Sequence, residues 1–169
     1  KINPSATDIQ NNIGVLLVKK NDVETAIRWY KAAIENKPNF FEAHENLGLA
    51  YSKAGQLNDA LNCLKAARAI SPQAATPHFN MGNIYMKLNE FSKAIKCFEK
   101  AIALEKNYPG AYSNLGIALR ITGKLDESIE SFKKALALNS YDAETFNNLG
   151  IAYLDNSQQS SAISSFISA

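Results

Sequence analysis

Residues 41–74 read FEAHENLGLAYSKAGQLNDALNCLKAARAISPQA, and the same pattern of small and apolar residues returns every 34 positions along the chain. The anchor of the pattern is a glycine that recurs without a slip. The five equivalent glycines are Gly14, Gly48, Gly82, Gly116 and Gly150. A fixed period of this length predicts an array of stacked units, because one unit is too small to bury its own apolar face.

Each unit is expected to hold two helices, since apolar residues three and four positions apart form one apolar stripe. In the second unit this spacing predicts a first helix over 41–54 and a second helix over 57–70. Gly55 breaks the chain between them, and Pro72 ends the second helix. A glycine inside a helix costs about 1 kcal/mol relative to alanine. Its recurrence in every first helix therefore indicates that a neighbouring helix passes too close for a Cβ.

The pattern resembles the tetratricopeptide repeat. The unit length, the small residue early in the first helix, the alanine–aromatic–alanine series in the second helix and the closing prolines Pro38 and Pro72 all agree. One departure is the loss of the tryptophan usual at the fourth position of a unit. Its place is taken by Gln10, His44, His78, Tyr112 and Phe146. The resemblance implies an all-α fold, a right-handed superhelical α-solenoid of antiparallel helix pairs, in which the first helices line a concave groove.

The repeat period makes residues 1–169 a single array. Its predicted parts are the tail of a missing upstream repeat over 1–6, four repeats over 7–40, 41–74, 75–108 and 109–142, and a truncated fifth repeat over 143–169. Pro4 lies 34 residues before Pro38, and the sequence stops inside the second helix of the fifth repeat. We therefore expect a slice of a longer protein, with a natural, processed terminus as the alternative.

An asparagine stands two residues before every repeat glycine, at a position expected to face the groove. The five are Asn12, Asn46, Asn80, Asn114 and Asn148. Asparagine is a poor helix former and packing does not demand it here. Its one acceptor and two donors could pair with the backbone of an extended peptide. The alternative is that each asparagine caps or bridges within its own repeat. This ladder resembles that of the repeat region of O-linked N-acetylglucosamine transferases, and the likeness concerns the groove only.

The neighbours of the ladder complete the predicted peptide-binding set. They are Lys19, Lys53, Lys87, Phe79, Asn83 and Arg120. The three lysines share one position of the repeat and would form a basic strip that suits a partly acidic ligand, although charge runs are usually solvated faces. Phe79 is either an anchor for a ligand or a packing residue against a neighbouring first helix.

A carboxylate clamp for the acidic tails of heat-shock chaperones is not expected. That class needs lysine three residues before the first-unit glycine and asparagine one residue after it, where this chain has Asn11 and Val15. It also needs lysine and arginine in the third unit, where Thr76 and Asn80 stand. We therefore reject chaperone-tail binding.

The sequence also argues against catalysis. His44 and His78 are one repeat apart, as are Cys63 and Cys97, so the repeat explains both pairs and no zinc-type ligand spacing is present. The chain lacks a glycine-rich phosphate loop and the common nucleophile motifs. We predict a protein that is not an enzyme and that needs no cofactor and no metal.

The amino-acid composition narrows the classes of partner that we expect. A formal net charge of +2 and a pI near 8.5 are too weak to argue for nucleic acid. No apolar run reaches the length of a membrane span, so we expect neither nucleic acid nor membrane as a partner. Two cysteines fit a reducing compartment, and the expected location is the cytoplasm.

Two function classes remain. The first is a protein–protein interaction module that binds an extended peptide segment in its groove through the asparagine ladder. The second is a structural scaffold, in which uncapped ends stack on copies of the chain and give a homo-oligomer. A variant of the first is an array that recruits substrates for an enzyme, such as a glycosyltransferase, attached elsewhere in the full chain.

Overall fold

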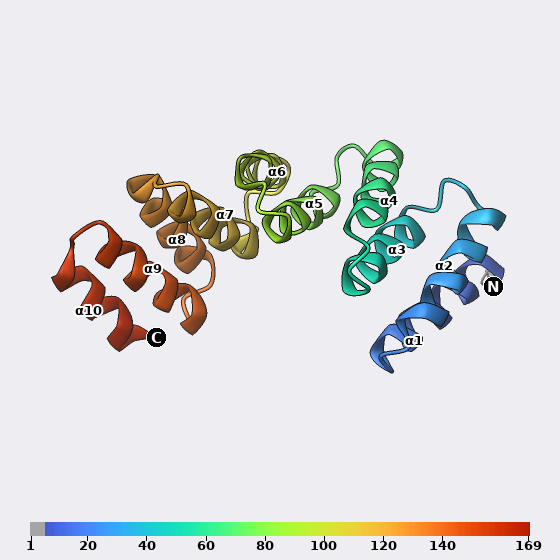
Figure 1. Cartoon of the computed structure of the whole chain (residues 1–169), viewed down its shortest axis with the longest axis horizontal. Coiled ribbons are helices and arrows are strands. Elements are labelled where there is room, and N and C mark those ends of the chain that lie inside the picture. Colours follow the sequence, from blue (N-terminus) through green and yellow to red (C-terminus); the bar gives the residue numbers. More distant parts are fainter. Residues whose placement is uncertain (1–5) are drawn as a thin grey trace. The chain divides into compact units, whose positions relative to one another are not determined.

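The computed structural model describes residues 6–169, and every regular element in that range is an α-helix (Figure 1). The first helices of the pairs are α1 (Ala6–Lys19), α3 (Phe41–Lys53), α5 (Thr76–Lys87), α7 (Pro109–Ile121) and α9 (Ala143–Asp155). The second helices are α2 (Val23–Asn36), α4 (Leu57–Ile70), α6 (Phe91–Leu104), α8 (Leu125–Leu138) and α10 (Gln159–Ser168). The all-α prediction is confirmed, and α3 and α4 match the two helices predicted for the second unit. Pro4 and nearly all of the predicted upstream tail lie outside the described residues.

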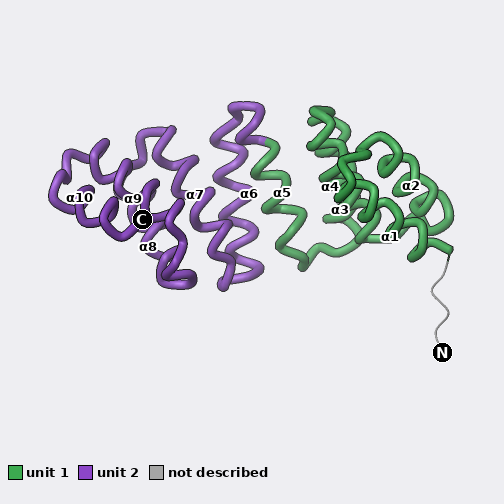
Figure 2. Tube along the Cα trace, turned by 90° about the horizontal axis from the view of Figure 1, so that it is seen from below, with its two compact units in different colours: residues 1–84 green, residues 85–169 purple. Residues whose placement is uncertain are grey.

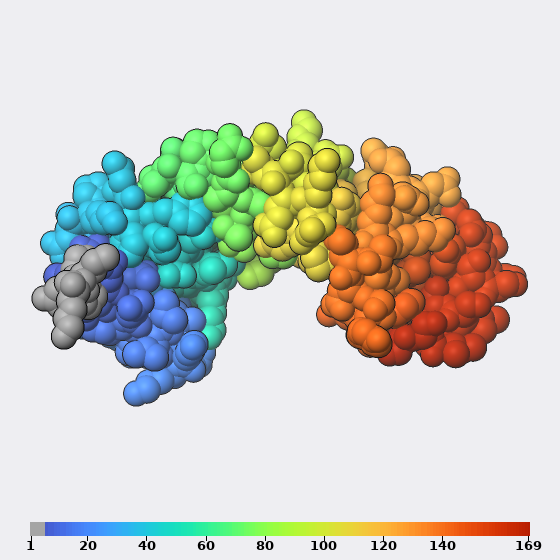
Figure 3. Space-filling view, turned by 180° about the vertical axis from the view of Figure 1, so that it is seen from behind, coloured from blue at the N-terminus to red at the C-terminus, as the bar shows by residue number. Residues whose placement is uncertain are grey.

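The helices form two compact units, Lys1–Ile84 and Tyr85–Ala169 (Figure 2). The boundary falls inside α5, so the third predicted repeat contributes to both units. The sequence pattern crosses this boundary unchanged, which is why the division does not show in the repeat period. Within unit 2, α10 packs against α9, and the residues of these two helices form the red end of the space-filling view (Figure 3).

The turn between the first and second helix has the same backbone conformation in every repeat. The residue seven positions after the repeat glycine has a left-handed conformation. These residues are Asn21 (φ 64°), Gly55 (φ 78°), Asn89 (φ 57°), Gly123 (φ 78°) and Ser157 (φ 59°). Glycine and asparagine tolerate this conformation, which ends the first helix and lets its last carbonyls bond the turn. The glycine that the sequence predicts as a break is thus one instance of a recurring turn.

The repeat glycines allow the second helix of the same unit to approach closely. A Cβ on Gly14 would lie 2.5 Å from Tyr30 Cε1, and one on Gly116 would lie 2.7 Å from Phe132 Cε1. Both distances are far below normal van der Waals contact, so the close approach predicted for the glycines is confirmed. The large residue that fills the space stands sixteen positions further along the chain.

The core lies where the second helix of one repeat packs on the first helix of the next. In unit 2, Ile129 and Phe132 of α8 form a buried cluster with Leu149 and Ala152 of α9. Ser128 replaces the alanine usual at its repeat position and is completely buried. Its hydroxyl donates a hydrogen bond of 2.8 Å to the carbonyl of Gly116, which satisfies the buried polar group.

Candidate functional site

A cavity of about 290 Å³ opens between α1 and α3, the first helices of the first two repeats. It lies wholly within unit 1. Its lining residues are Val15, Val18 and Lys19 from α1, Tyr30 from α2, and Asn46, Leu49, Ala50 and Lys53 from α3. Steps of three and four residues place the α3 members on one helix face, and Val15 and Lys19 of α1 stand at the repeat positions of Leu49 and Lys53. This is the face expected to line the groove.

The base of the cavity is the ring of Tyr30, which is buried against Gly14. Burial raises the pKa of Tyr30 to about 12, so the phenol is neutral throughout the physiological range. The side walls are aliphatic, and Leu49 remains 46% exposed. The cavity therefore offers a mainly aliphatic surface to a ligand, and the Tyr30 ring that borders it is almost fully buried.

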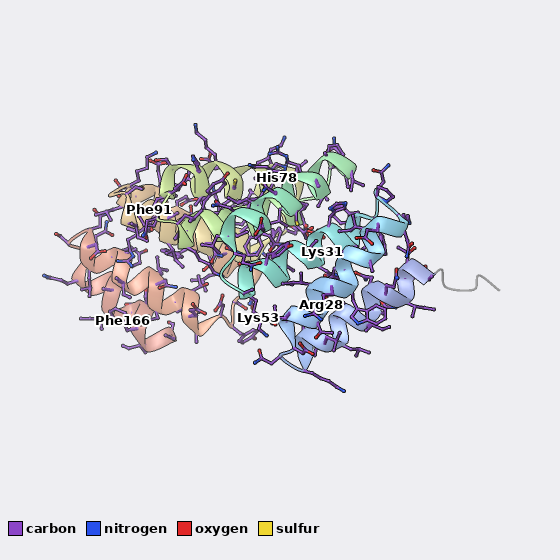
Figure 4. All side chains as sticks on the ribbon, turned by 45° about the vertical axis from the view of Figure 1, so that its right-hand side comes forward. Arg28, Lys31, Lys53, His78, Phe91 and Phe166 are labelled. Carbon is purple, nitrogen blue, oxygen red and sulfur yellow. The ribbon has the colours of Figure 1, made fainter. Side chains whose placement is uncertain are left out.

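Among the described residues, the only charged ones that line this cavity are Lys19 and Lys53. Lys53 reaches from the end of α3 to the end of α1, where its Nζ donates a long hydrogen bond of 3.5 Å to the carbonyl of Val18 (Figure 4). Both lysines are exposed, and no carboxylate from residues 6–169 lines the cavity. The apolar surface is thus bordered by positive charge.

The ladder residue in the cavity, Asn46, is held by a neighbouring helix. Its Nδ2 donates a hydrogen bond of 2.9 Å to Oδ1 of Asn11, which is buried in α1. This contact is a bridge between adjacent repeats, so it differs from the bridge within one repeat that was considered for the ladder, and it does not test ligand binding. The bond uses one of the two N–H donors of the Asn46 amide.

The other ladder asparagines lie outside this cavity. Asn12 is exposed on α1, whereas Asn80 in unit 1 and Asn114 and Asn148 in unit 2 are partly buried. Of the remaining candidates, Phe79 and Asn83 are partly buried on α5, and Lys87 is exposed at its end. The structure therefore brings together Asn46, Lys19 and Lys53 from the predicted set and leaves the others apart from that cavity.

Arg120 is engaged within the protein. Its Nη1 lies 3.0 Å from Oδ2 of Asp155, one repeat further along. Ile121 stands at the repeat position that holds lysine in the first three repeats. The carboxylate of Asp155 therefore balances the positive charge of Arg120, which weakens the prediction that Arg120 binds a ligand.

Sequence reasoning assigned neither Asn11, which bonds Asn46, nor Tyr30 to the site. The repeat position of Asn11 holds asparagine again only at Asn147 and carries other residue types in the three middle repeats, so no regular signal marks it. Tyr30 follows the pattern of large core residues and was assigned to packing alone. Its ring fills the space over Gly14 and also forms the base of the cavity.

Within residues 6–169, no group of three or more His, Cys, Asp or Glu side chains is placed to hold a metal ion. No described helix is long and apolar enough to cross a membrane. Cys63 and Cys97 are free thiols, and burial raises the pKa of Cys63 to about 11, which makes it a weak nucleophile at neutral pH.

Comparisons with known proteins agree with the helix pairs. The family model for the TPR repeat matches residues 14–55, 51–89, 82–120 and 118–157. No curated protein sequence matches the chain. A crystal structure of MamA is similar, with a TM-score of 0.84 and 29% identity over 92% of this chain and 91% of that one. MamA 41-end from Desulfovibrio magneticus RS-1 has a TM-score of 0.87 at 20% identity, covering 96% of this chain and 92% of that one.

YrrB, described as a TPR protein with an unusual peptide-binding site, has a TM-score of 0.76 at 22% identity, covering 94% of this chain and 82% of that one. At this identity the likeness shows the fold alone. The family match and the helix pairs support a protein–protein interaction module. The chain belongs to the tetratricopeptide repeat family.

Proposed function

We propose that this interaction module binds an extended peptide segment along the face formed by its first helices. The observation that carries the proposal is the cavity between α1 and α3, where an apolar surface, a held asparagine amide and two lysines meet. Pockets that bind ligands typically combine an apolar lining with a few placed polar groups. The peptide-binding site in the description of YrrB supports the same use of the fold.

The asparagines supply the backbone contacts in this proposal. An amide presents both donor and acceptor, as does each peptide unit of an extended chain. Asn46 is already oriented by Asn11, so less side-chain freedom is lost when a peptide binds. Affinity then comes from backbone pairing, and selectivity comes from the side chains around it.

The proposal is tested by selection from a random heptapeptide library, followed by fluorescence anisotropy with the enriched peptides. Leu49→Asp places a charge in the cavity wall and is expected to weaken binding by about tenfold or more. The matched control is Leu138→Asp on α8, because Leu138 is 42% exposed and Leu49 is 46% exposed. A library that yields no binder, or binders that tolerate Leu49→Asp as well as Leu138→Asp, overturns the proposal.

A second candidate function is self-association, favoured by apolar residues exposed at α10 and α1. Phe166 of α10 is 39% exposed, whereas Phe132 at the same repeat position is fully buried by packing against α9. Leu16 of α1 is 58% exposed, while alanines at its repeat position, such as Ala50, are buried. These are the faces that repeats use to stack on each other.

In this second candidate, α10 of one copy receives α1 of the next. Sedimentation velocity over a hundredfold concentration range is the test. Growth of the sedimentation coefficient with concentration, abolished by Ile163→Lys with Ile167→Lys, would support stacking. A monomer at every concentration would exclude it and leave peptide binding untouched.

A further inference from the structure

We propose that the cavity between α1 and α3 recognises an apolar side chain flanked by aspartate or glutamate within an extended peptide. This inference rests on the proposed function and adds the chemical class of the ligand. Three observations carry it: the size and lining of the cavity, the charge at its edge, and the contrast with the corresponding positions in unit 2.

The cavity is sized for a side chain. Its volume of about 290 Å³ lies at the lower end of the range for small-molecule pockets. Val15, Val18, Leu49 and Ala50 offer only hydrocarbon, and the neutral ring of Tyr30 forms the base. One leucine, methionine or phenylalanine side chain can bury its surface there. A charged side chain would lose its hydration without gaining a partner on those walls.

The charged residues at the edge of the cavity determine which peptide residues are favoured on either side of that apolar side chain. Lys19 and Lys53 occupy the same repeat position on adjacent first helices. The bond from Lys53 Nζ to the carbonyl of Val18 places its ammonium between the two helices. An ammonium has three N–H donors, so this bond leaves donors for a carboxylate. With no carboxylate among the lining residues, the complementary ligand charge is negative.

Unit 2 shows what the same positions look like when their charge is internally balanced. Arg120 and Asp155 stand four and five positions after their repeat glycines and pair at 3.0 Å. In unit 1 the corresponding residues are Val18 and Lys53, so a lysine stands where unit 2 has the aspartate, and its partner is a backbone carbonyl. Uncompensated positive charge is therefore a property of the α1–α3 cavity and is absent from the Arg120–Asp155 pair.

Side-chain carboxylates inside the peptide are the proposed source of negative charge, since the ladder asparagines imply a chain that continues in both directions. The experiment therefore uses peptides with an acetylated N-terminus and an amidated C-terminus. The probe peptide carries Asp-Leu-Asp flanked by serines. A matched peptide with Asn-Leu-Asn removes the negative charges, and a second one with Asp-Ala-Asp reduces the apolar volume of the central side chain. Affinities are measured by fluorescence anisotropy, beside the peptides enriched from the library.

The expected result is binding of the Asp-Leu-Asp peptide about tenfold tighter than either matched peptide. The double variant Lys19→Gln/Lys53→Gln should bind the aspartate and asparagine peptides equally. Lys20→Gln/Lys65→Gln removes the same charge from exposed sites outside the cavity and should keep the preference. Raising the salt from about 0.05 M to about 0.5 M should also reduce the preference, because exposed charges are screened.

The outcomes separate this inference from the proposed function. Library peptides without acidic enrichment, whose binding is still abolished by Leu49→Asp, overturn the inference and leave peptide binding standing. A preference for acidic peptides that survives Lys19→Gln/Lys53→Gln also overturns it. If the library yields no enriched peptide, both this inference and the proposed peptide binding are overturned.

Discussion

Asn46 of α3 donates a hydrogen bond of 2.9 Å to Oδ1 of Asn11 in α1, although the two residues are 35 positions apart. One partner belongs to the regular ladder and the other does not. The bond therefore couples a position that is asparagine in every repeat to one that is asparagine only at Asn11 and Asn147, so the repeat period does not predict it.

Removing Asn11 should cost stability. Asn11→Ala is expected to be about 1 kcal/mol less stable than Asn12→Ala, since only the first change leaves the partly buried Asn46 amide without its partner. Both changes bring the same gain in helix propensity, so their difference isolates the bond. Urea denaturation followed by circular dichroism measures it. Equal midpoints for the two variants would show that the bond contributes nothing.

The left-handed turn at Ser157 predicts a stabilising substitution. Ser157 has φ 59°, a conformation that costs a residue with a Cβ about 1 kcal/mol. Ser157→Gly should raise the free energy of unfolding by about that amount. Gly123→Ser, at the same turn position with φ 78°, should lower it similarly. If both variants shift the unfolding midpoint in the same direction, the turn explanation is wrong.

A methyl group at Gly116 should overpack the core. The added Cβ would lie 2.7 Å from Phe132 Cε1, and overpacking typically costs about 1–3 kcal/mol. Gly110→Ala is the matched control, because Gly110 is exposed in the first turn of the same helix. That variant should be neutral or stabilised by up to about 1 kcal/mol. Thermal unfolding of the two variants distinguishes packing from helix propensity.

The buried phenol of Tyr30 is expected to lower the free energy of unfolding at high pH. Burial raises its pKa from 10.0 to about 12, so the folded state favours the neutral phenol. The resulting stability is complete below pH 10 and is lost as the pH rises from 10 to about 12, by up to about 2–3 kcal/mol. Tyr30→Phe cannot ionise and should lack this decline. Urea midpoints across that pH range check it, and parallel curves for the two proteins would contradict the assignment.

Much of the fold could be predicted because it depends on local spacing. The helices over 41–54 and 57–70 follow from apolar residues three and four apart, and the structure places them at Phe41–Lys53 and Leu57–Ile70. The close approach at the repeat glycines followed from the cost of glycine in a helix. The same reasoning could not find the division inside α5, since the repeat pattern is unchanged there.

The sequence by itself determined the helix pairs, the family and the face that carries the ladder, because these properties repeat every 34 residues. Only the tertiary structure decided which side chains on that face meet. Asn46 bonds Asn11, Lys53 reaches Val18, and Arg120 pairs with Asp155. Each contact joins helices one repeat apart and depends on their separation and on side-chain rotamers. Spacing along the chain specifies a face, whereas pairing across helices requires the packed geometry.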